Sequence, residues 1–171
     1  MPKVGVGRVG DVFVMEEMIS GFSKDEIFEL YQFLKIYESD IKSKKLKKVI
    51  LQYPRLADSE WTKLKKDLTH LSMKNQSNFK TPIPPNTLLD GEQGIVRTRV
   101  INHIRNAIVH HSLEKDSHYP LIFLTDKYNW ADKKKKHKKG DFSAQYFFDE
   151  NLFWKIIRIF TKPENNETKN T

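Results

Sequence analysis

A helical spacing of apolar residues along the first two thirds of the chain constrains the fold more than any other feature. Ser23 and Glu26 have the spacing of a capping box, and the apolar residues that follow recur at intervals of three and four. The same spacing predicts helices over about residues 24–38, 41–53, 58–73 and 88–113. Four helices in sequence favour a mainly α fold.

The pattern changes after Pro120. Two short apolar runs, 121–125 and 142–148, have the length and composition of strands. The basic run 133–140, KKKKHKKG, separates them and predicts a loop. A last helix is expected over residues 152–160. We therefore expect a mainly α fold with a short β-hairpin after the fourth helix and a C-terminal helix.

Length and composition indicate one globular domain. The 171 residues are 38% hydrophobic, and we expect a domain over residues 23–161, a poorly defined N-terminal segment over 1–22 and a flexible tail over 162–171. Gly5, Gly7 and Gly10 match the spacing of a dinucleotide-binding loop, but no strand precedes them and no βαβ repeat follows. We interpret this stretch as a flexible segment.

Charge and cysteine content bear on partners and compartment. The formal net charge is +8, which favours a polyanion such as nucleic acid as a partner. The sequence has no cysteine and no apolar run long enough for a membrane span. We expect a cytoplasmic protein that does not contact a membrane.

The stretch 97–112, RTRVINHIRNAIVHHS, carries the densest functional signal. On a helical wheel most of its apolar residues fall on one arc. The opposite arc is crowded with polar side chains suited to phosphodiester chemistry: Arg99, Asn102, His103, Arg105, Asn106 and His110. Histidine can move a proton near neutral pH, and arginine can hold phosphate oxygens with its planar fork. RNA cleavage at its own 2′-hydroxyl needs no metal, so we expect neither metal nor cofactor.

The run IRNAIVHH, residues 104–111, resembles the motif of the HEPN superfamily: an arginine, a polar residue directly after it, and a histidine after four to six intervening residues. Arg105, Asn106 and His110 fit that motif. The resemblance implies a compact antiparallel helical bundle. It also implies a metal-independent RNA endonuclease that cleaves through the 2′-hydroxyl, in the manner of a toxin or defence effector. It also implies a homodimer, with an antitoxin or defence-system protein as a further partner. The alternative is a non-catalytic RNA-binding or dimerising scaffold.

Several assignments within this interpretation stay open. His111 directly follows His110, so the ring that faces the cleft is undetermined. An offset motif of Arg97 and His103 is disfavoured because the wheel places Arg97 among the apolar residues. Zinc binding is a weaker alternative, and so is DNA binding by a basic helical protein, because no clear helix-turn-helix occurs. We expect RNA contacts from Arg99, Asn102, His103, Lys134, Lys135 and Lys136.

Two apolar residues, Val109 and Leu113, lie inside the polar arc. Apolar residues set within a polar face suggest contact with a partner. We therefore predict that the helices of two protomers meet near these residues.

Overall fold

The computed structural model describes residues 21–42, 58–73 and 83–162. The elements in chain order are α2 (Lys24–Ile36), the π-helix η1 (Tyr37–Ile41), α4 (Asp58–Lys66), β1 (Thr69–Ser72), β2 (Thr87–Asp90), α5 (Arg97–Val109), β3 (Leu113–Lys115), β4 (Leu121–Lys127), β5 (Phe142–Asp149) and α6 (Glu150–Thr161). No helix in the described ranges is long and apolar enough to cross a membrane.

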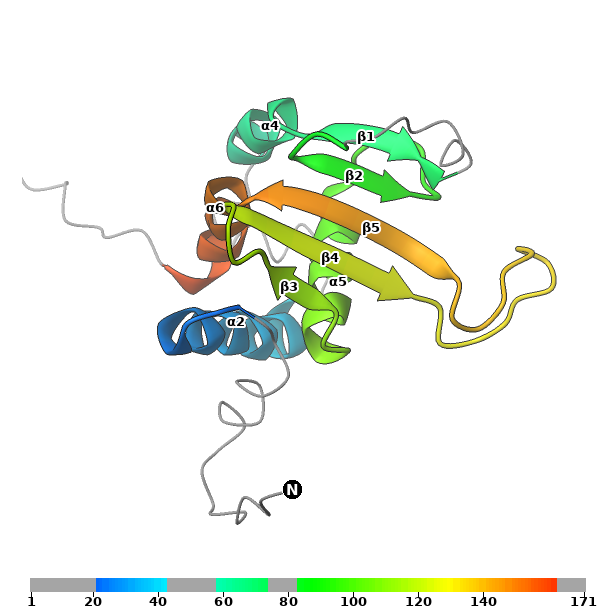
Figure 1. Cartoon of the computed structure of the whole chain (residues 1–171), viewed down its shortest axis with the longest axis horizontal. Helices are drawn as coiled ribbons and strands as arrows, with labels where there is room; N and C mark the ends of the chain where they lie inside the picture. The colour runs from blue at the N-terminus through cyan, green and yellow to red at the C-terminus, as the bar shows by residue number, and fades with distance from the viewer. Residues whose placement is uncertain (1–20, 43–57, 74–82, 163–171) are drawn as a thin grey trace, which may run out of the picture.

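The strands form one mixed sheet in the order β1-β2-β5-β4-β3 (Figure 1). β1 runs parallel to β2, and the other neighbouring pairs are antiparallel. The prediction of a mainly α helical bundle is therefore wrong, and the fold is α/β. The error lies in the stretches 58–73 and 88–113, which hold strands as well as helices.

Short strands explain the error. In the first stretch the helix ends at Lys66, and residues 69–72 pair with residues 87–90. In the second, α5 occupies only the middle, between strands β2 and β3. All four residues of β2 are buried, so this strand has none of the polar alternation that would mark it in a sequence.

The predicted hairpin and C-terminal helix are confirmed. β4 and β5 pair over their whole length, with Leu121 opposite Asp149 at one end and Lys127 opposite Phe142 at the other. Asp149 caps α6 by accepting hydrogen bonds from the amides of Asn151 and Leu152. These strands form the middle of the sheet, so the predicted hairpin is part of the core.

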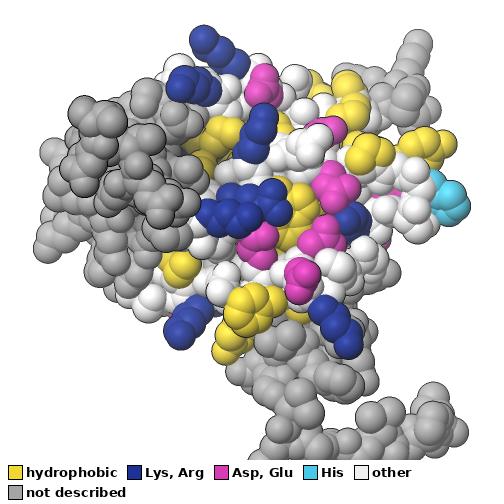
Figure 2. Space-filling model, turned by 90° about the vertical axis from the view of Figure 1, so that its left-hand side faces the viewer, with side chains coloured by type: hydrophobic (Ala, Val, Ile, Leu, Met, Phe, Trp, Pro, Cys, Tyr) yellow, Lys and Arg dark blue, Asp and Glu magenta, His cyan; other side chains and the backbone are white. Residues whose placement is uncertain are grey.

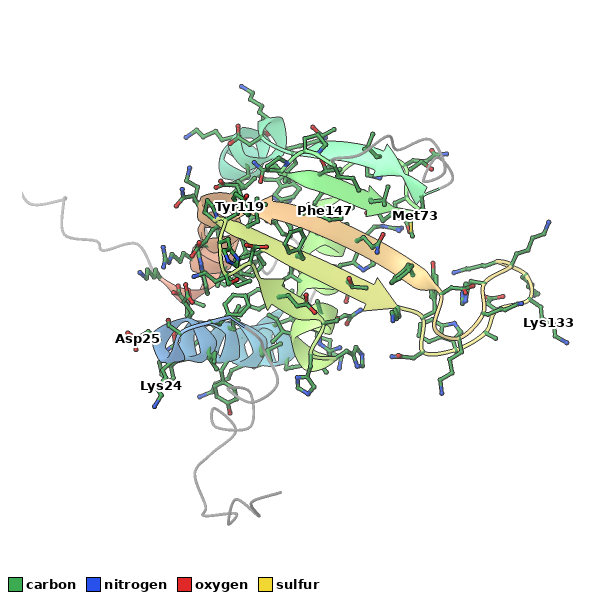
Figure 3. The ribbon with its side chains drawn as sticks, viewed as in Figure 1. Lys24, Asp25, Met73, Tyr119, Lys133 and Phe147 are labelled. Carbon is green, nitrogen blue, oxygen red and sulfur yellow. The ribbon has the colours of Figure 1, made fainter. Side chains whose placement is uncertain are left out.

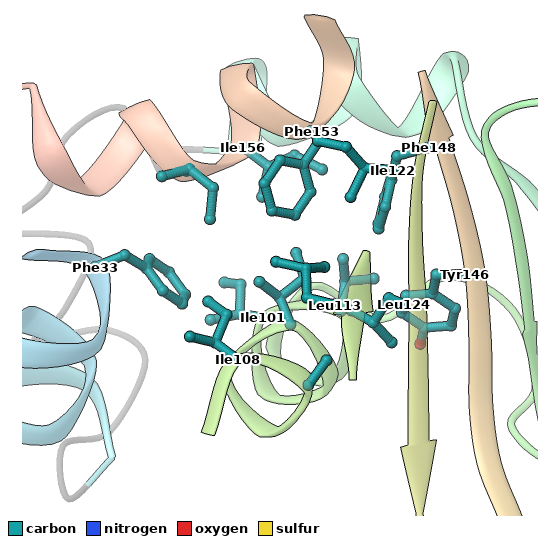
Figure 4. Close-up of a cluster of buried hydrophobic side chains, with 14 of the residues drawn as sticks. Phe33, Ile101, Ile108, Leu113, Ile122, Leu124, Tyr146, Phe148, Phe153 and Ile156 are labelled. Atoms are coloured by element: carbon teal, nitrogen blue, oxygen red, sulfur yellow. The ribbon is translucent and has the colours of Figure 1, made fainter. Parts of the chain in front are cut away.

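The helices α5 and α6 cover one face of the sheet, and α2 packs on their outer side (Figures 1 and 4). Strand side chains alternate, so Ile122 and Leu124 of β4 and Tyr146 and Phe148 of β5 are fully buried on this face. They meet a row of apolar side chains from α6 and α5: Leu152, Phe153, Ile156, Ile101, Ile104 and Ile108. Burial of this apolar surface stabilises the arrangement and fixes the position of α5.

The predicted capping box begins α2 as expected. The Ser23 hydroxyl accepts from the Glu26 amide, and the Glu26 carboxylate accepts from the Ser23 amide at 2.8 Å. Lys115 ties α2 to α6 through Glu26 and Glu150, each at 2.7 Å. Burial would lower the pKa of Lys115, but the two carboxylates raise it above its ordinary value.

Some expectations lie outside the described residues. These are the glycine-containing segment, all of the helix predicted over 41–53 except its first two residues, and most of the C-terminal tail. Within the described ranges, η1 follows α2 directly. The helix predicted over 24–38 therefore continues to Ile41, and its last part is a π-helix.

Candidate active site

Helix α5 presents the predicted polar side chains beside the sheet. The apolar arc expected from the wheel is buried: Val100, Ile101, Ile104, Ala107 and Ile108. Arg97 is also buried, which agrees with its predicted place among the apolar residues. The polar arc faces the end of β4 and the π-helix η1, and its contacts with them define the site.

Asp126 is the centre of the site. It follows Ile122 and Leu124 on the buried side of β4, and only 5% of the residue is exposed. Its Oδ2 lies 2.8 Å from Nδ1 of His103 and accepts a hydrogen bond from Nδ2 of Asn106 at 3.0 Å. A carboxylate can only accept, so Nδ1 of His103 carries the hydrogen, and Nε2 is the nitrogen left for proton exchange.

The charge of Asp126 is stabilised by these contacts. Burial alone would raise the pKa of this carboxyl group. The hydrogen bonds from His103 and Asn106, together with the electrostatic interaction with His103, bring the pKa below its ordinary value instead. Asp126 is therefore an anion at neutral pH, and it holds two α5 side chains in fixed orientations.

Arg105 extends the site toward η1. Its Nη1 donates to Oδ1 of Asn106 at 3.0 Å, and its Nε donates to Glu38 at 2.7 Å. The guanidinium also lies 5.9 Å from the centre of the Tyr37 ring. Hydrogen bonds from Lys42 and then Arg105 hold the pKa of Glu38 below its usual value. We call Glu38, His103, Arg105, Asn106 and Asp126 the α5 network.

His110 lies at the C-cap of α5 and is exposed. Its Nε2 is 3.4 Å from Nδ2 of Asn129, at the base of the loop between β4 and β5. No contact among the described residues joins His110 to Arg105. The two residues are five positions apart, which corresponds to about 7.5 Å along a helix axis. The structure thus brings Arg105 and Asn106 together with His103, and places His110 at one end of the same helix.

His111 ends the helix. Its φ of 56° is in the left-handed region, and its side chain is exposed. The helix stops at Val109, so helical spacing does not set the direction of this ring. Leu113 is also misplaced by the longer predicted helix. It is fully buried in β3 and is not part of an exposed face, whereas Val109 is 37% exposed.

The remaining predicted RNA contacts divide into two groups. Arg99 forms an ion pair with Glu92, and Asn102 accepts a hydrogen bond from the Tyr37 hydroxyl at 3.0 Å. These two side chains therefore already have partners within the protein. Lys134, Lys135 and Lys136 are all exposed in the loop between β4 and β5.

A second histidine–aspartate pair lies behind the site. Nε2 of His70 is 2.8 Å from Oδ1 of Asp90, and the Tyr146 hydroxyl donates to Oδ2 of Asp90 at 2.6 Å. Burial, with the nearby Asp90, strongly raises the pKa of Tyr146, so its hydroxyl keeps its proton. The ring of Tyr146 also meets that of His103 edge to face, with centroids 5.4 Å apart. Tyr146 thus separates the two pairs and packs against the ring that Asp126 orients.

The sequence pattern did not indicate Asp126, Glu38 or the His70–Asp90 pair. Strand alternation carries the signal for Asp126, because it continues the buried series of Ile122 and Leu124. The described residues contain no group of three or more His, Asp or Glu side chains arranged to hold a metal ion.

Searches of protein-family models, curated proteins and solved structures find no match to this chain.

Proposed function

We propose that the protein is a metal-independent RNA endonuclease acting in the cytoplasm, with Arg105, Asn106 and His110 at its active site. The supporting observation is the hydrogen-bonded series Asp126–Asn106–Arg105. It fixes an arginine fork on the same helix as an exposed histidine. The sequence resemblance to the HEPN motif concerns these same three residues.

The chemistry follows from the side chains. Nε2 of His110 accepts the proton of the RNA 2′-hydroxyl, and the 2′-oxygen attacks phosphorus. The bond from phosphorus to the 5′-oxygen breaks, and that oxygen takes a proton from solvent. The products are a 2′,3′-cyclic phosphate and a 5′-hydroxyl. Arg105 stabilises the negative charge that grows on the phosphate oxygens during attack.

Substrate binding requires Arg105 to exchange one partner for another. Glu38 now occupies two guanidinium nitrogens, Nε and Nη2. The Glu38 side chain is 40% exposed, so its ion pair with Arg105 is worth about 0–1 kcal/mol. A phosphate can therefore replace Glu38 at low cost. Asn106 keeps its hydrogen bonds to Asp126 and Arg105 and maintains the orientation of the guanidinium.

The test is cleavage of RNA in the presence of EDTA. His110→Ala is expected to lower the cleavage rate about 10²–10⁴-fold, as is usual for loss of a proton-transfer group. Arg105→Ala should have a similar effect, and Arg105→Lys should rescue it only in part because lysine lacks the bidentate fork. His111→Ala is the matched control, since it changes the neighbouring exposed histidine and should retain most activity.

One observation favours a second function, a non-catalytic RNA-binding or dimerising module. Arg105 is paired with Glu38 and does not contact His110 among the described residues. Wild-type protein that binds RNA and leaves it whole would support this alternative. Cleavage that depends on magnesium or manganese would contradict the metal-independent mechanism.

A further inference from the structure

The loop between β4 and β5 is an ordered extension of these strands. Tyr128 donates its amide to the carbonyl of Asp141 at 3.0 Å, and Gly140 donates back to Tyr128 at 2.8 Å. Further out, Asp132 and His137 exchange backbone hydrogen bonds at 3.0 and 3.2 Å. We call residues 128–141 the basic hairpin. Its backbone is held in place by these hydrogen bonds.

The turn of the basic hairpin concentrates positive charge. It holds six exposed lysines: Lys133, Lys134, Lys135, Lys136, Lys138 and Lys139. The two carboxylates of the hairpin accept from backbone amides, Asp132 from those of Lys134 and Lys135 and Asp141 from that of Lys138. No ion pair in the described part of the chain involves the six lysines. Their mutual repulsion in a tight turn would be relieved by a polyanion.

The opposite end of the molecule has no comparable run of lysines among its described residues (Figure 2). Lys133 lies at the far tip of the hairpin, which projects from the sheet (Figure 3). Figure 2 shows the opposite end of the molecule, where basic and acidic side chains are mixed. At that end Arg158 is paired with Glu29 and Lys115 with Glu26. The excess positive charge of the described residues is therefore most concentrated on the hairpin.

Aromatic rings accompany the lysines. His137 stacks on Tyr128 with ring centroids 3.6 Å apart and planes 6° from parallel. Trp130 meets both rings edge to face at 6.3 Å, and it is 61% exposed. The indole ring is thus supported by its neighbours and open to a ligand. Rigid, exposed aromatic rings beside lysines are the parts from which single-strand binding sites are made.

We propose that the basic hairpin binds single-stranded RNA, with Trp130 stacking on a base and the lysines contacting the backbone phosphates. The placement of this RNA rests on the proposed function. Asn129, at the base of the hairpin, contacts His110, so a strand bound along the hairpin would lead to the proposed active site. The bases of a duplex are already stacked on each other and do not offer their faces to Trp130. Within residues 128–141 Trp130 is the one large apolar side chain that is exposed, which is little for insertion into a membrane.

The experiment measures binding separately from cleavage. The full-length protein is titrated with a labelled 12-nucleotide 2′-O-methyl RNA, which lacks the attacking hydroxyl, and with the same strand in a duplex. Trp130→Ala should weaken single-strand binding about 5- to 150-fold, the range for loss of one stacked base. Trp130→Phe should restore part of it. Tyr119→Ala is the matched control, because Tyr119 is 67% exposed and precedes the other end of β4.

Charge is tested in the same assay. The combined variant Lys133→Gln, Lys134→Gln, Lys135→Gln and Lys136→Gln should reduce the salt dependence of binding. The slope of log K against log salt concentration should become shallower by about 0.7 for each phosphate that is no longer neutralised. Equal loss of affinity in Trp130→Ala and Tyr119→Ala, or no loss in either, would overturn the proposal. Tighter binding to the duplex would also overturn it, as would binding of the protein to anionic vesicles through Trp130 without binding to RNA. If the wild type binds in this way but never cleaves RNA, the hairpin proposal stands and the nuclease proposal fails.

Discussion

Replacing Asp126 with asparagine removes the charge at the centre of the α5 network and leaves an oxygen able to accept hydrogen bonds. In the wild type, Oδ2 of Asp126 accepts from both His103 and Asn106 in a nearly buried position. Hydrogen bonds to charged groups contribute about 1.5–3 kcal/mol each, and charge assistance supplies roughly half. Asp126→Asn should therefore lower the free energy of unfolding by about 1.5–3 kcal/mol. Asp126→Ala leaves both donors without this acceptor and should cost about 3–5 kcal/mol.

The effect of pH gives the sharper test. The folded-state pKa of Asp126 is below its ordinary value of 3.8, so its charge stabilises the fold at pH above that value. This stability is lost as pH falls through the folded-state pKa, because protonation makes Asp126 neutral like asparagine. Urea unfolding of wild type and Asp126→Asn should thus differ most at pH 7 and converge below about pH 3.8.

The exposed Asp67 provides the control, and Asp67→Asn should change stability by no more than about 0.5 kcal/mol. The reasoning is refuted if Asp126→Asn is as stable as wild type at pH 7. It is also refuted if the difference persists undiminished in acid, since the charge would then not be its source.

Two further predictions follow from Glu38 and Val109. Glu38→Gln should weaken the hold on Arg105 and lower KM for RNA, with little change in Tm because Glu38 is exposed. A raised KM would mean that Glu38 positions Arg105 for the substrate. Val109 is 37% exposed beside His110, and we propose that two protomers meet there. Wild type should then sediment as a dimer and Val109→Asp as a monomer. Thr98→Asp, at an exposed position of the same helix, should leave sedimentation unchanged, and equal behaviour of the two variants would argue against a dimer through Val109.

The parts of the fold that were predicted correctly have strong local signals. The Ser23–Glu26 capping box marks the beginning of α2, and Asp149 marks that of α6. The strands β4 and β5 run for seven and eight residues, and their alternation is long enough to identify them. The fold class was wrong because β1, β2 and β3 have only three or four residues each. Helical spacing accommodates so few residues equally well, and the antiparallel partner of β2 is β5, far along the chain.

The candidate site shows the same division. The polar face of α5 follows from helical spacing, and the structure places Arg105, Asn106 and His103 in one hydrogen-bonded series. Asp126 was missed because the apolar run before it was taken to end at Thr125. Glu38 was missed because it lies 67 residues from Arg105, and a local pattern does not report such a contact.

The central position of β4 and β5 has a consequence for how the chain folds. These strands and α6 follow one another directly along the chain from Leu121 to Thr161, so they can assemble with little loop-closure entropy. β2 must join them from more than fifty residues away, as the pairing of Leu88 with Tyr146 shows. We therefore expect the segment 121–161 to form the folding nucleus. β1, at one edge of the sheet, is expected to pack last. Native-state hydrogen exchange should accordingly be slowest at the amides of β4 and β5 and fastest, among the strands, at those of β1.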